Sequence, residues 1–343
     1  MRRSLHHRPN RKHGCRHLGN RRLDLIREPK RRAHVSIVGA GAVGVAVATS
    51  IAHARVVSRL SLYDIAADKA RGEAMDLAHG APLLGGLQVD GAGVDALETG
   101  DLCIVTAGAK QKVGEDRQSL LARNEKAMDD IAEALFRRGL PKLVLVVTNP
   151  CDVMTEALRR RLEPKGVSVF GSGTLLDTMR LRHALSRTLA ISPESVHVSV
   201  VGEHGDSSVC LLDSGRAGGL SLADAFRARG IVFDEARRAA LATEVRGAAY
   251  EIIARKGATS HAIGVAVARI ARAVIQDERA VLPVSAPVRA GMCAGVPCVL
   301  GASGIEVLPL CGLSEREEEE LARSHAVLRE RCGELRFGGV HVT

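Results

Sequence analysis

The sequence has few residues with which to build an aromatic core: its 343 residues include no Trp, two Tyr and five Phe. The core must therefore consist mainly of Ala, Val, Leu and Ile. No apolar run approaches the roughly 18 residues that span a bilayer. The N-terminus also lacks the apolar segment of a secretory signal. These absences predict a globular protein with no membrane partner.

The cysteines lack any paired spacing. Eight are scattered along the chain without a CxxC motif, and no internal repeat accompanies them. In a chain of this length, such scatter is typical of reduced thiols in a cytoplasmic protein. Thiols within apolar runs behave as small hydrophobic side chains, and no metal site is expected.

An excess of positive charge is confined to one segment. The chain has a net charge of +9, but residues 1–33 alone contribute +10, from twelve basic and two acidic residues. This segment has few apolar residues and no periodicity, which predicts a disordered basic tail. A nucleic-acid-binding arm, a mitochondrial transit peptide and an extension without function, arising from a start codon assigned too far upstream, remain open. Since nothing in it resembles a base-reading fold, we expect no nucleic-acid partner.

Apolar strands and helical patterns alternate from His34 onwards. Strands are expected at 34–38, 59–64, 101–108, 142–150 and 167–173, and helices at 45–54, 67–80, 124–139 and 174–185. Continuous apolar strands between helices predict a parallel sheet covered on both faces. The fold class expected is α/β, with a Rossmann-type doubly wound parallel sheet in residues 34–170.

The pattern loosens after about residue 170, which predicts an α+β substrate domain over 171–336, followed by a short tail at 337–343. Antiparallel strands are expected at 195–204 and 207–214, further strands at 283–291 and 295–301, and helices at 234–257, 261–278 and 313–335. Ser314 and Glu317 have the spacing of a capping box at the start of the closing helix.

The segment GAGAVG matches the dinucleotide-binding pattern GxGxxG. It follows a strand and opens a helix, and Asp64 ends the next strand 20 residues beyond the last glycine. Gly39 permits the tight turn, Gly41 lets the backbone approach a pyrophosphate, and Gly44 allows close packing of helix on strand. The Asp64 carboxylate would accept hydrogen bonds from the adenosine ribose hydroxyls and repel a 2′-phosphate. The expected cofactor is therefore NAD rather than NADP.

A single imidazole lies between two glycines in VVGEHGDSSV, at the end of an apolar run. Histidine exchanges a proton near neutral pH, which a hydride-transfer reaction requires. Asp177 and Arg180 share one face of a predicted helix. Asp177 is a candidate for orienting His204, and Arg180 for gripping a substrate carboxylate. A buried structural histidine and a surface Asp/Arg pair remain the alternative.

Several motifs together resemble the L-lactate/malate dehydrogenase family. They are GAGAVG, TAGAKQKVGEDR, RNEKAM, VVTNPCDVMT, GSGTLLDTMRLR, VVGEHGDSSV and AAYEIIARKGATSHAIG, in the family's order over residues 34–335. The resemblance implies that His204 is the proton donor and acceptor and that Asp177 orients it. It also implies that Arg117, on a mobile loop, polarises the reacting carbonyl.

The resemblance further implies a set of binding residues. Substrate contacts are expected at Arg180, Gln111, Asn149 and Thr259. Besides the three glycines and Asp64, cofactor contacts are expected at Ala42, Val43, Thr106, Ala107, Gly108 and Asn149. Among the departures from the family pattern are Asp116 and Val113 near the mobile arginine, His261 in place of an aromatic residue, and a shortened hairpin near 289–295.

Gln111 indicates which 2-oxo acid is preferred. Malate dehydrogenases have an arginine at this position, which pairs with the second carboxylate of oxaloacetate. A neutral amide leaves that carboxylate without a counter-charge in a closing pocket, which is costly. The expected substrates are therefore lactate and pyruvate, with malate or another 2-hydroxy acid as the alternative and a non-catalytic NAD-binding or structural protein as the rival of another class.

The resemblance also suggests assembly and regulation. Arg182 and His197 match positions at which some bacterial members bind fructose 1,6-bisphosphate between subunits, and a basic pair suits a phosphate. Packing and surface roles compete with that interpretation. A homotetramer is the oligomer that the resemblance implies.

Overall fold

A computed structural model describes residues 33–109, 117–288 and 291–335. The chain divides into the units Met1–Arg31 and Arg32–Thr343, and the fold below belongs to the second. The predicted basic tail, apart from Ala33, and the predicted tail at 337–343 lie outside the described residues.

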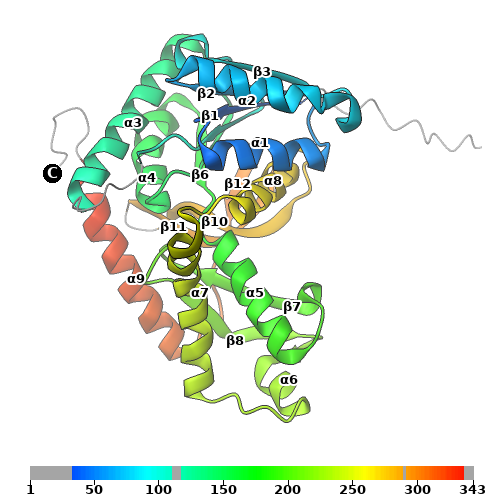
Figure 1. Ribbon diagram of the computed structural model, residues 1–343. Helices are drawn as coiled ribbons and strands as arrows, with labels where there is room; N and C mark the ends of the chain where they lie inside the picture. Colours follow the sequence, from blue (N-terminus) through cyan, green and yellow to red (C-terminus); the bar gives the residue numbers. More distant parts are fainter. Residues whose placement is uncertain (1–32, 110–116, 289–290, 336–343) are drawn as a thin grey trace, which may run out of the picture. The chain divides into compact units, whose positions relative to one another are not determined.

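One large sheet runs through the second unit (Figure 1). In the described residues it has nine strands, in the order β12-β11-β10-β6-β5-β4-β1-β2-β3. The strands of its parallel part are β1 (His34–Val38), β2 (Arg59–Asp64), β3 (Gln88–Gly93), β4 (Leu102–Val105), β5 (Leu143–Val146) and β6 (Ser168–Gly171). Their order, 3-2-1-4-5-6, is that of the doubly wound dinucleotide-binding fold, which confirms the predicted fold class.

The helices cover both faces of this sheet because successive strand residues point to opposite sides. Ile37 and Leu145 belong to the cluster packed under α1 (Ala42–Ala54) and α8 (His261–Ile275). Val38 and Val146 belong to the opposite cluster. That cluster packs under α3 (Arg117–Arg138), α4 (Cys151–Leu162) and α9 (Glu315–Gly333). Helix α2 (Ala67–His79) packs beside β2 and β3.

The late strands join this same sheet. They are β10 (Ala280–Val288), β11 (Met292–Gly301) and β12 (Gly304–Val307). Ser285 of β10 pairs antiparallel with Gly171 of β6. A side chain at position 171 would meet Ser285 and Thr155, so only glycine admits this approach. Segments more than 100 residues apart in sequence thus share one sheet.

A second, three-stranded sheet consists of β7 (Val196–Val201), β8 (Val209–Ala217) and β9 (Leu220–Ser221). It packs with α5 (Leu175–Leu189), α6 (Leu222–Ala228) and α7 (Glu235–Lys256) around Phe226 and Leu185. The antiparallel pairing of β7 and β8 agrees with the sequence expectation.

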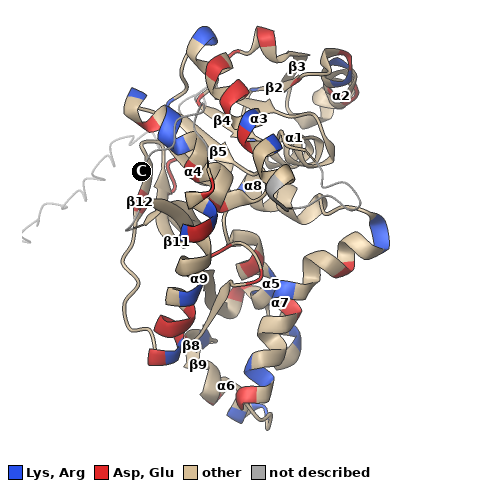
Figure 2. Ribbon diagram, turned by 90° about the vertical axis from the view of Figure 1, so that its left-hand side faces the viewer, with Lys and Arg blue, Asp and Glu red and all other residues tan. Residues whose placement is uncertain are grey.

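The closing helix begins as predicted. The side chain of Ser314 accepts from the amide of Glu317, and the Glu317 carboxylate accepts from the amide of Ser314. Acidic residues gather in this first turn, where they complement the helix dipole (Figure 2). No helix in the described part of the chain is long and apolar enough to cross a membrane.

Short one-turn helices complete the fold at the connections. They are η1 (Ala81–Leu84), η2 (Val94–Ala96), η3 (Glu163–Lys165) and η4 (Pro193–Ser195). Besides the short elements α6, β9 and β12, the sequence expectation omitted β3 and α4. The first has a polar, glycine-containing sequence, QVDGAG. The second begins directly after Pro150 without a side-chain cap.

Candidate active site

The Gly-rich turn joins β1 to α1 at the carboxyl end of β1, next to the carboxyl end of β4. Gly39 has φ +110, and its amide donates to the carbonyl of Tyr63 over 2.6 Å. A Cβ on Gly39 would lie 2.5 Å from the amide nitrogen of Ala107, and one on Gly44 would lie 1.8 Å from the carbonyl oxygen of Gly39. These two glycines are therefore required by the turn itself.

Gly41 differs from its neighbours because no atom lies within 4 Å of where its Cβ would be. The start of α1 carries no side-chain cap and no acidic residue in its first turn. The amides of Ala42 and Val43 therefore face an open approach, with the positive end of the helix dipole behind them. A pyrophosphate fits such a helix start.

Asp64 ends β2 beside this turn. Its Oδ2 accepts from the amide of Ala40 over 2.7 Å, and its Oδ1 accepts from the amide of Ala66 over 3.0 Å. A carboxylate has about four acceptor sites, so capacity remains for ribose hydroxyls. The turn, the bare helix start and this carboxylate fit NAD.

The end of β4 contacts the Gly-rich turn. The Thr106 hydroxyl donates to the carbonyl of Gly39 over 2.8 Å, and the Ala107 amide donates to the carbonyl of Val38 over 2.9 Å. A Cβ on Gly108 would lie 2.5 Å from Cγ2 of Thr148. The end of β4 is thereby packed directly against β1 and β5.

Asn149 follows β5, and its backbone is held by a residue that the sequence interpretation did not assign. The buried Asn124 side chain donates to the carbonyl of Asn149 over 2.8 Å and accepts from the amide of Ala109 over 2.6 Å. The motif RNEKAM contains Asn124, but its spacing gave no sign of this bridge.

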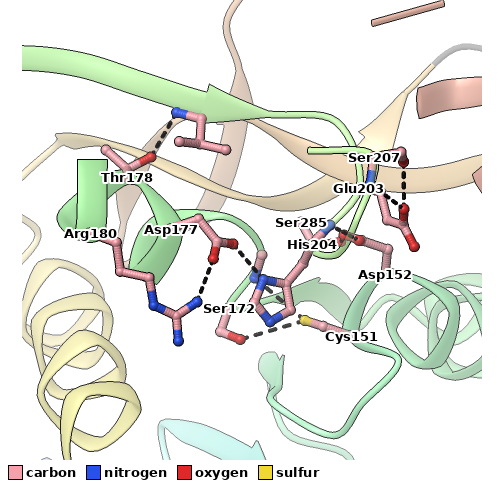
Figure 3. Close-up of polar contacts among 12 residues, drawn as sticks. Cys151, Asp152, Ser172, Asp177, Thr178, Arg180, Glu203, His204, Ser207 and Ser285 are labelled. Carbon is pink, nitrogen blue, oxygen red and sulfur yellow. Dashed lines mark hydrogen bonds and ion pairs between the residues drawn. The ribbon is translucent and has the colours of Figure 1, made fainter. Parts of the chain in front are cut away.

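His204 and Asp177 meet across two elements. His204 follows the end of β7, and Asp177 lies in the first turn of α5. Nδ1 of His204 lies 2.5 Å from Oδ2 of Asp177 (Figure 3). This contact leaves Nε2 as the nitrogen available for exchange of a proton with a substrate.

The surroundings favour the charged form of this imidazole. Burial alone lowers the pKa of His204, but the charge and hydrogen bond of Asp177 outweigh it and raise the pKa above the usual value. Burial raises the pKa of Asp177, yet His204 and Arg180 together lower it below its usual value. The pair is therefore suited to hold a proton on the ring.

Arg180 lies one helical turn beyond Asp177. Its Nη1 donates to Oδ1 of Asp177 over 2.7 Å. Within the part of the chain that the structure describes, Asp177 is the one partner of this guanidinium, so further donors are available for a carboxylate.

A cavity of roughly 270 Å³ collects these groups. His204, Asp177, Arg180 and Asn149 line it together with residues of α3, α7 and α9. The lining is completed by Leu120, Leu121, Pro150, Glu203, Gly205, Asp206, Arg246, Ala249, Tyr250, Ile253 and Arg331. The structure thus brings an imidazole, a carboxylate and a guanidinium to one small space.

Other residues expected at the site lie elsewhere or outside the described residues. Gln111, with Val113 and Asp116, falls in the segment 110–116 that the structure does not describe. Arg117 is the first residue of α3, and its side chain lies outside the description. Thr259 is half-buried between α7 and α8 and does not line the cavity.

The expected effector pair lies away from this cavity. Arg182 donates to the carbonyl of Pro193 through Nε and Nη2, over 3.2 and 2.8 Å. His197 is exposed on β7, where it pairs with Arg216 of β8.

Two acidic side chains near His204 were not assigned from the sequence. Glu203 is buried, forms an ion pair with Arg331 of α9 and accepts from Ser207. Asp152, at the start of α4, accepts from the backbone amide of His204. The one signal for Asp152 in the sequence was a carboxylate within the apolar stretch CDVM.

A doubly wound sheet with a Gly-rich turn of this geometry is typical of dinucleotide-binding enzymes such as NAD-dependent dehydrogenases. The family model for the lactate/malate dehydrogenase NAD binding domain matches residues 33–171, and that for the lactate/malate dehydrogenase alpha/beta C-terminal domain matches residues 174–335. The chain belongs to the lactate/malate dehydrogenase family. This confirms the resemblance seen in the sequence, the enzyme class and the NAD cofactor.

Individual relatives cover nearly the whole chain. The L-lactate dehydrogenase of Nitratidesulfovibrio vulgaris (strain DP4) is 38% identical over 306 residues, which are 88% of this chain and 99% of that protein. The L-lactate dehydrogenase of Gloeobacter violaceus is 39% identical over 314 residues, 88% of this chain and 93% of that protein. A solved lactate dehydrogenase from a Medee basin deep-sea metagenome library has a TM-score of 0.83 and 33% identity, and the match covers 90% of this chain and 100% of that one.

Proposed function

We propose that this protein is an L-lactate dehydrogenase that interconverts L-lactate and pyruvate with NAD. The observation that carries the proposal is the convergence of His204, Asp177 and Arg180 on one cavity. The relatives named L-lactate dehydrogenase support the choice of substrate.

The substrate carboxylate binds to Arg180 in this proposal. Asp177 holds the guanidinium in place from one side, which leaves its other donors to form a fork around the carboxylate. Substrate is thereby fixed with its reacting carbon next to His204.

Proton transfer belongs to His204. In lactate oxidation Nε2 of the neutral ring takes the hydroxyl proton, and Asp177 stabilises the imidazolium that results. In pyruvate reduction the ring begins protonated and returns the proton to the carbonyl oxygen. Bound NAD supplies the acceptor or donor of the hydride, held by the Gly-rich turn, Asp64 and the end of β4.

Gln111, which lies in the segment 110–116, and the side chain of Arg117 complete the proposed site. Arg117 polarises the reacting carbonyl, since it begins the helix whose next turn lines the cavity with Leu120 and Leu121. Gln111 excludes a second carboxylate, because an amide supplies no counter-charge. Asn149, which lines the cavity, lies near both substrate and nicotinamide in this proposal. Thr259, which the resemblance implies for the substrate pocket, lies between α7 and α8 outside the cavity lining, so its place in the pocket stays a prediction.

Assembly, regulation and location are further parts of this proposal. We propose a homotetramer, a fructose 1,6-bisphosphate site at Arg182 and His197, and a cytoplasmic location. The exposure of His197 leaves it accessible to a phosphate. Among the described cysteines none forms a disulfide, which supports a reducing compartment.

A comparison of substrates tests the proposal. Steady-state oxidation of NADH is measured with pyruvate and with oxaloacetate, each with and without fructose 1,6-bisphosphate. A kcat/KM at least tenfold higher for pyruvate is expected. A preference for oxaloacetate would instead favour malate dehydrogenase and overturn the argument from Gln111. Light scattering of the same samples reports the oligomeric state.

A further inference from the structure

Three consecutive amides at the end of β7 are each held by a different element. The amide of Gly202 donates to the carbonyl of Gly295 in β11 over 2.9 Å. The amide of Glu203 donates to Oγ of Ser324 in α9 over 2.8 Å. The amide of His204 donates to Oδ2 of Asp152 in α4 over 2.7 Å. Of these three acceptors only Asp152 carries a charge.

Asp152 is itself fixed by the large sheet. It is 2% exposed, and its Oδ1 accepts from Oγ of Ser285 over 2.6 Å. Ser285 lies on β10 at the single point where that strand pairs with β6, opposite Gly171. Both carboxylate oxygens thus act as acceptors, and the chain Ser285–Asp152–His204 connects the large sheet to the loop after β7 (Figure 3).

We propose that Asp152 is a positioning residue for His204, which fixes the backbone beneath the imidazole and adds a second negative charge beside the ring. This inference rests on the proposed function, in which His204 exchanges the proton. Asp177 acts on the ring through Nδ1, whereas Asp152 acts on the same residue through its backbone (Figure 3). The two carboxylates come from different helices, α5 and α4.

Several charged groups surround His204, and their pairing determines how much the charge of Asp152 affects the ring. Asp177 and Arg180 face it from α5, and Asp152 faces it from α4. Other charged side chains in the cavity wall are Glu203, Asp206, Arg246 and Arg331. Glu203 is paired with Arg331. The charge of Asp177 is shared with Arg180, whereas the described partners of Asp152, the Ser285 hydroxyl and the His204 amide, are both neutral. Burial raises the pKa of Asp152, but its hydrogen bonds from Ser285 and His204 act in the opposite direction and favour the charged form. In that form Asp152 adds a negative charge close to the imidazole.

The test compares substitutions of two side chains that accept hydrogen bonds from adjacent backbone amides, those of His204 and Glu203. Asp152→Asn keeps an oxygen that accepts from His204 and an amide that donates to Ser285, but it removes the charge. Ser324→Ala is the matched control, because it removes a buried, neutral acceptor from the neighbouring amide of Glu203. The His204 ring is titrated by NMR with ¹³C-labelled histidine, and its signal is assigned as the one lost in His204→Gln. Asp152→Asn is expected to lower the pKa of His204, and Ser324→Ala to leave it unchanged.

Kinetics supply a second readout. In Asp152→Ala the amide of His204 loses its acceptor and the ring loses its placement. A fall of about 10- to 100-fold in kcat with pyruvate is expected. The KM for pyruvate should change little, because Arg180 remains in place. If Asp152 had a merely structural role, Asp152→Ala and Ser324→Ala would lower thermal stability equally, and kcat would not fall selectively in Asp152→Ala.

The unmodified protein provides a measurement that does not depend on the variants folding. The His204 amide should exchange with solvent far more slowly than the amide of the exposed neighbour Asp206, by at least about 100-fold. Equal exchange, or an unchanged pKa of His204 in folded Asp152→Asn, overturns the inference. Absence of turnover with any 2-oxo acid would reject the proposed function but not the role of Asp152. Amide exchange and titration of His204 are both measured without substrate.

Discussion

Nδ1 of His204 lies 2.5 Å from Oδ2 of Asp177, although 27 positions separate the two residues in the chain. The contact requires β7 to end beside the first turn of α5. Val200, near the end of β7, donates its amide to the Thr178 hydroxyl over 2.9 Å, so the residue after Asp177 holds the strand in register. The pair is therefore built into the packing of β7 on α5.

The rates of pyruvate reduction and of lactate oxidation should depend on pH in opposite ways. The net effect of Asp177 raises the pKa of His204, so the ring remains protonated to a higher pH than an exposed histidine. Pyruvate reduction needs the protonated ring, and its rate is expected to fall as pH rises through that pKa. Lactate oxidation needs the neutral ring, and its rate should rise over the same range. Profiles of kcat/KM in both directions check this, and parallel profiles would contradict the role of His204.

Asp177→Asn should uncouple the ring from its charge partner. Without the carboxylate the pKa of His204 falls and the imidazolium is less stable, so kcat for pyruvate reduction should fall by about 10²- to 10⁴-fold. The profile of pyruvate reduction should also move to lower pH. Asp224→Asn, an equal change at an exposed position of helix α6, is the control and should retain its rate. If the two variants have equal rates, Asp177 does not act on His204.

Arg180→Lys tests the grip on the substrate. Lysine retains the positive charge but cannot form two parallel hydrogen bonds with a carboxylate. The KM for pyruvate should rise by about 10- to 100-fold, as expected for the loss of one hydrogen bond between charged groups. The Kd for NADH, measured by fluorescence, should remain near its original value. A KM for pyruvate that stays constant would remove Arg180 from the substrate site.

Gly39 and Gly41 should respond differently to alanine. In Gly39→Ala the new Cβ collides with the amide of Ala107 at φ +110, and the free energy of unfolding should fall by about 1–3 kcal/mol. In Gly41→Ala the Cβ enters open space, so stability should stay within about 0.5 kcal/mol. The Kd for NADH should nevertheless rise about tenfold, because the methyl occupies the approach of the pyrophosphate. Urea denaturation and NADH titration separate the two effects, and tight NADH binding by Gly41→Ala would place the pyrophosphate elsewhere.

Asp64→Asn should reduce the discrimination between NADH and NADPH. The amide accepts more weakly from ribose hydroxyls and no longer repels a 2′-phosphate, so the Kd for NADH should rise by about 10- to 100-fold while that for NADPH falls. Asp68→Asn on the exposed face of α2 is the control for charge at a distance. An unchanged ratio of the two Kd values would argue against Asp64 as the ribose acceptor.

The sequence predicted the elements that carry strong periodicity or a motif. The strand, the Gly-rich turn and Asp64 belong to one local unit, so their relationship could be inferred from spacing alone. The capping box at Ser314 is local in the same sense. The polar edge strand β3 was missed because it lacks an apolar run.

Long-range pairing lay beyond such inference. Nothing in the local sequence of β10 indicates that Ser285 pairs with Gly171, because that contact depends on how the intervening chain folds. For the same reason Asp152 was not assigned, although it lies in a motif that the sequence singled out. Its role depends on the backbone of His204, which arrives from 52 positions away.

The continuation of the large sheet into β10–β12 has a consequence for dissection of the protein. A fragment that ends after β6 would leave the β6 edge, and the apolar faces that meet β10 and α8, open to water. Such a bare edge invites pairing with other copies. The nucleotide-binding half is therefore not an excisable module, and expressed alone it should aggregate. Helix α8 and strands β10–β12 are as much a part of its architecture as the first strand.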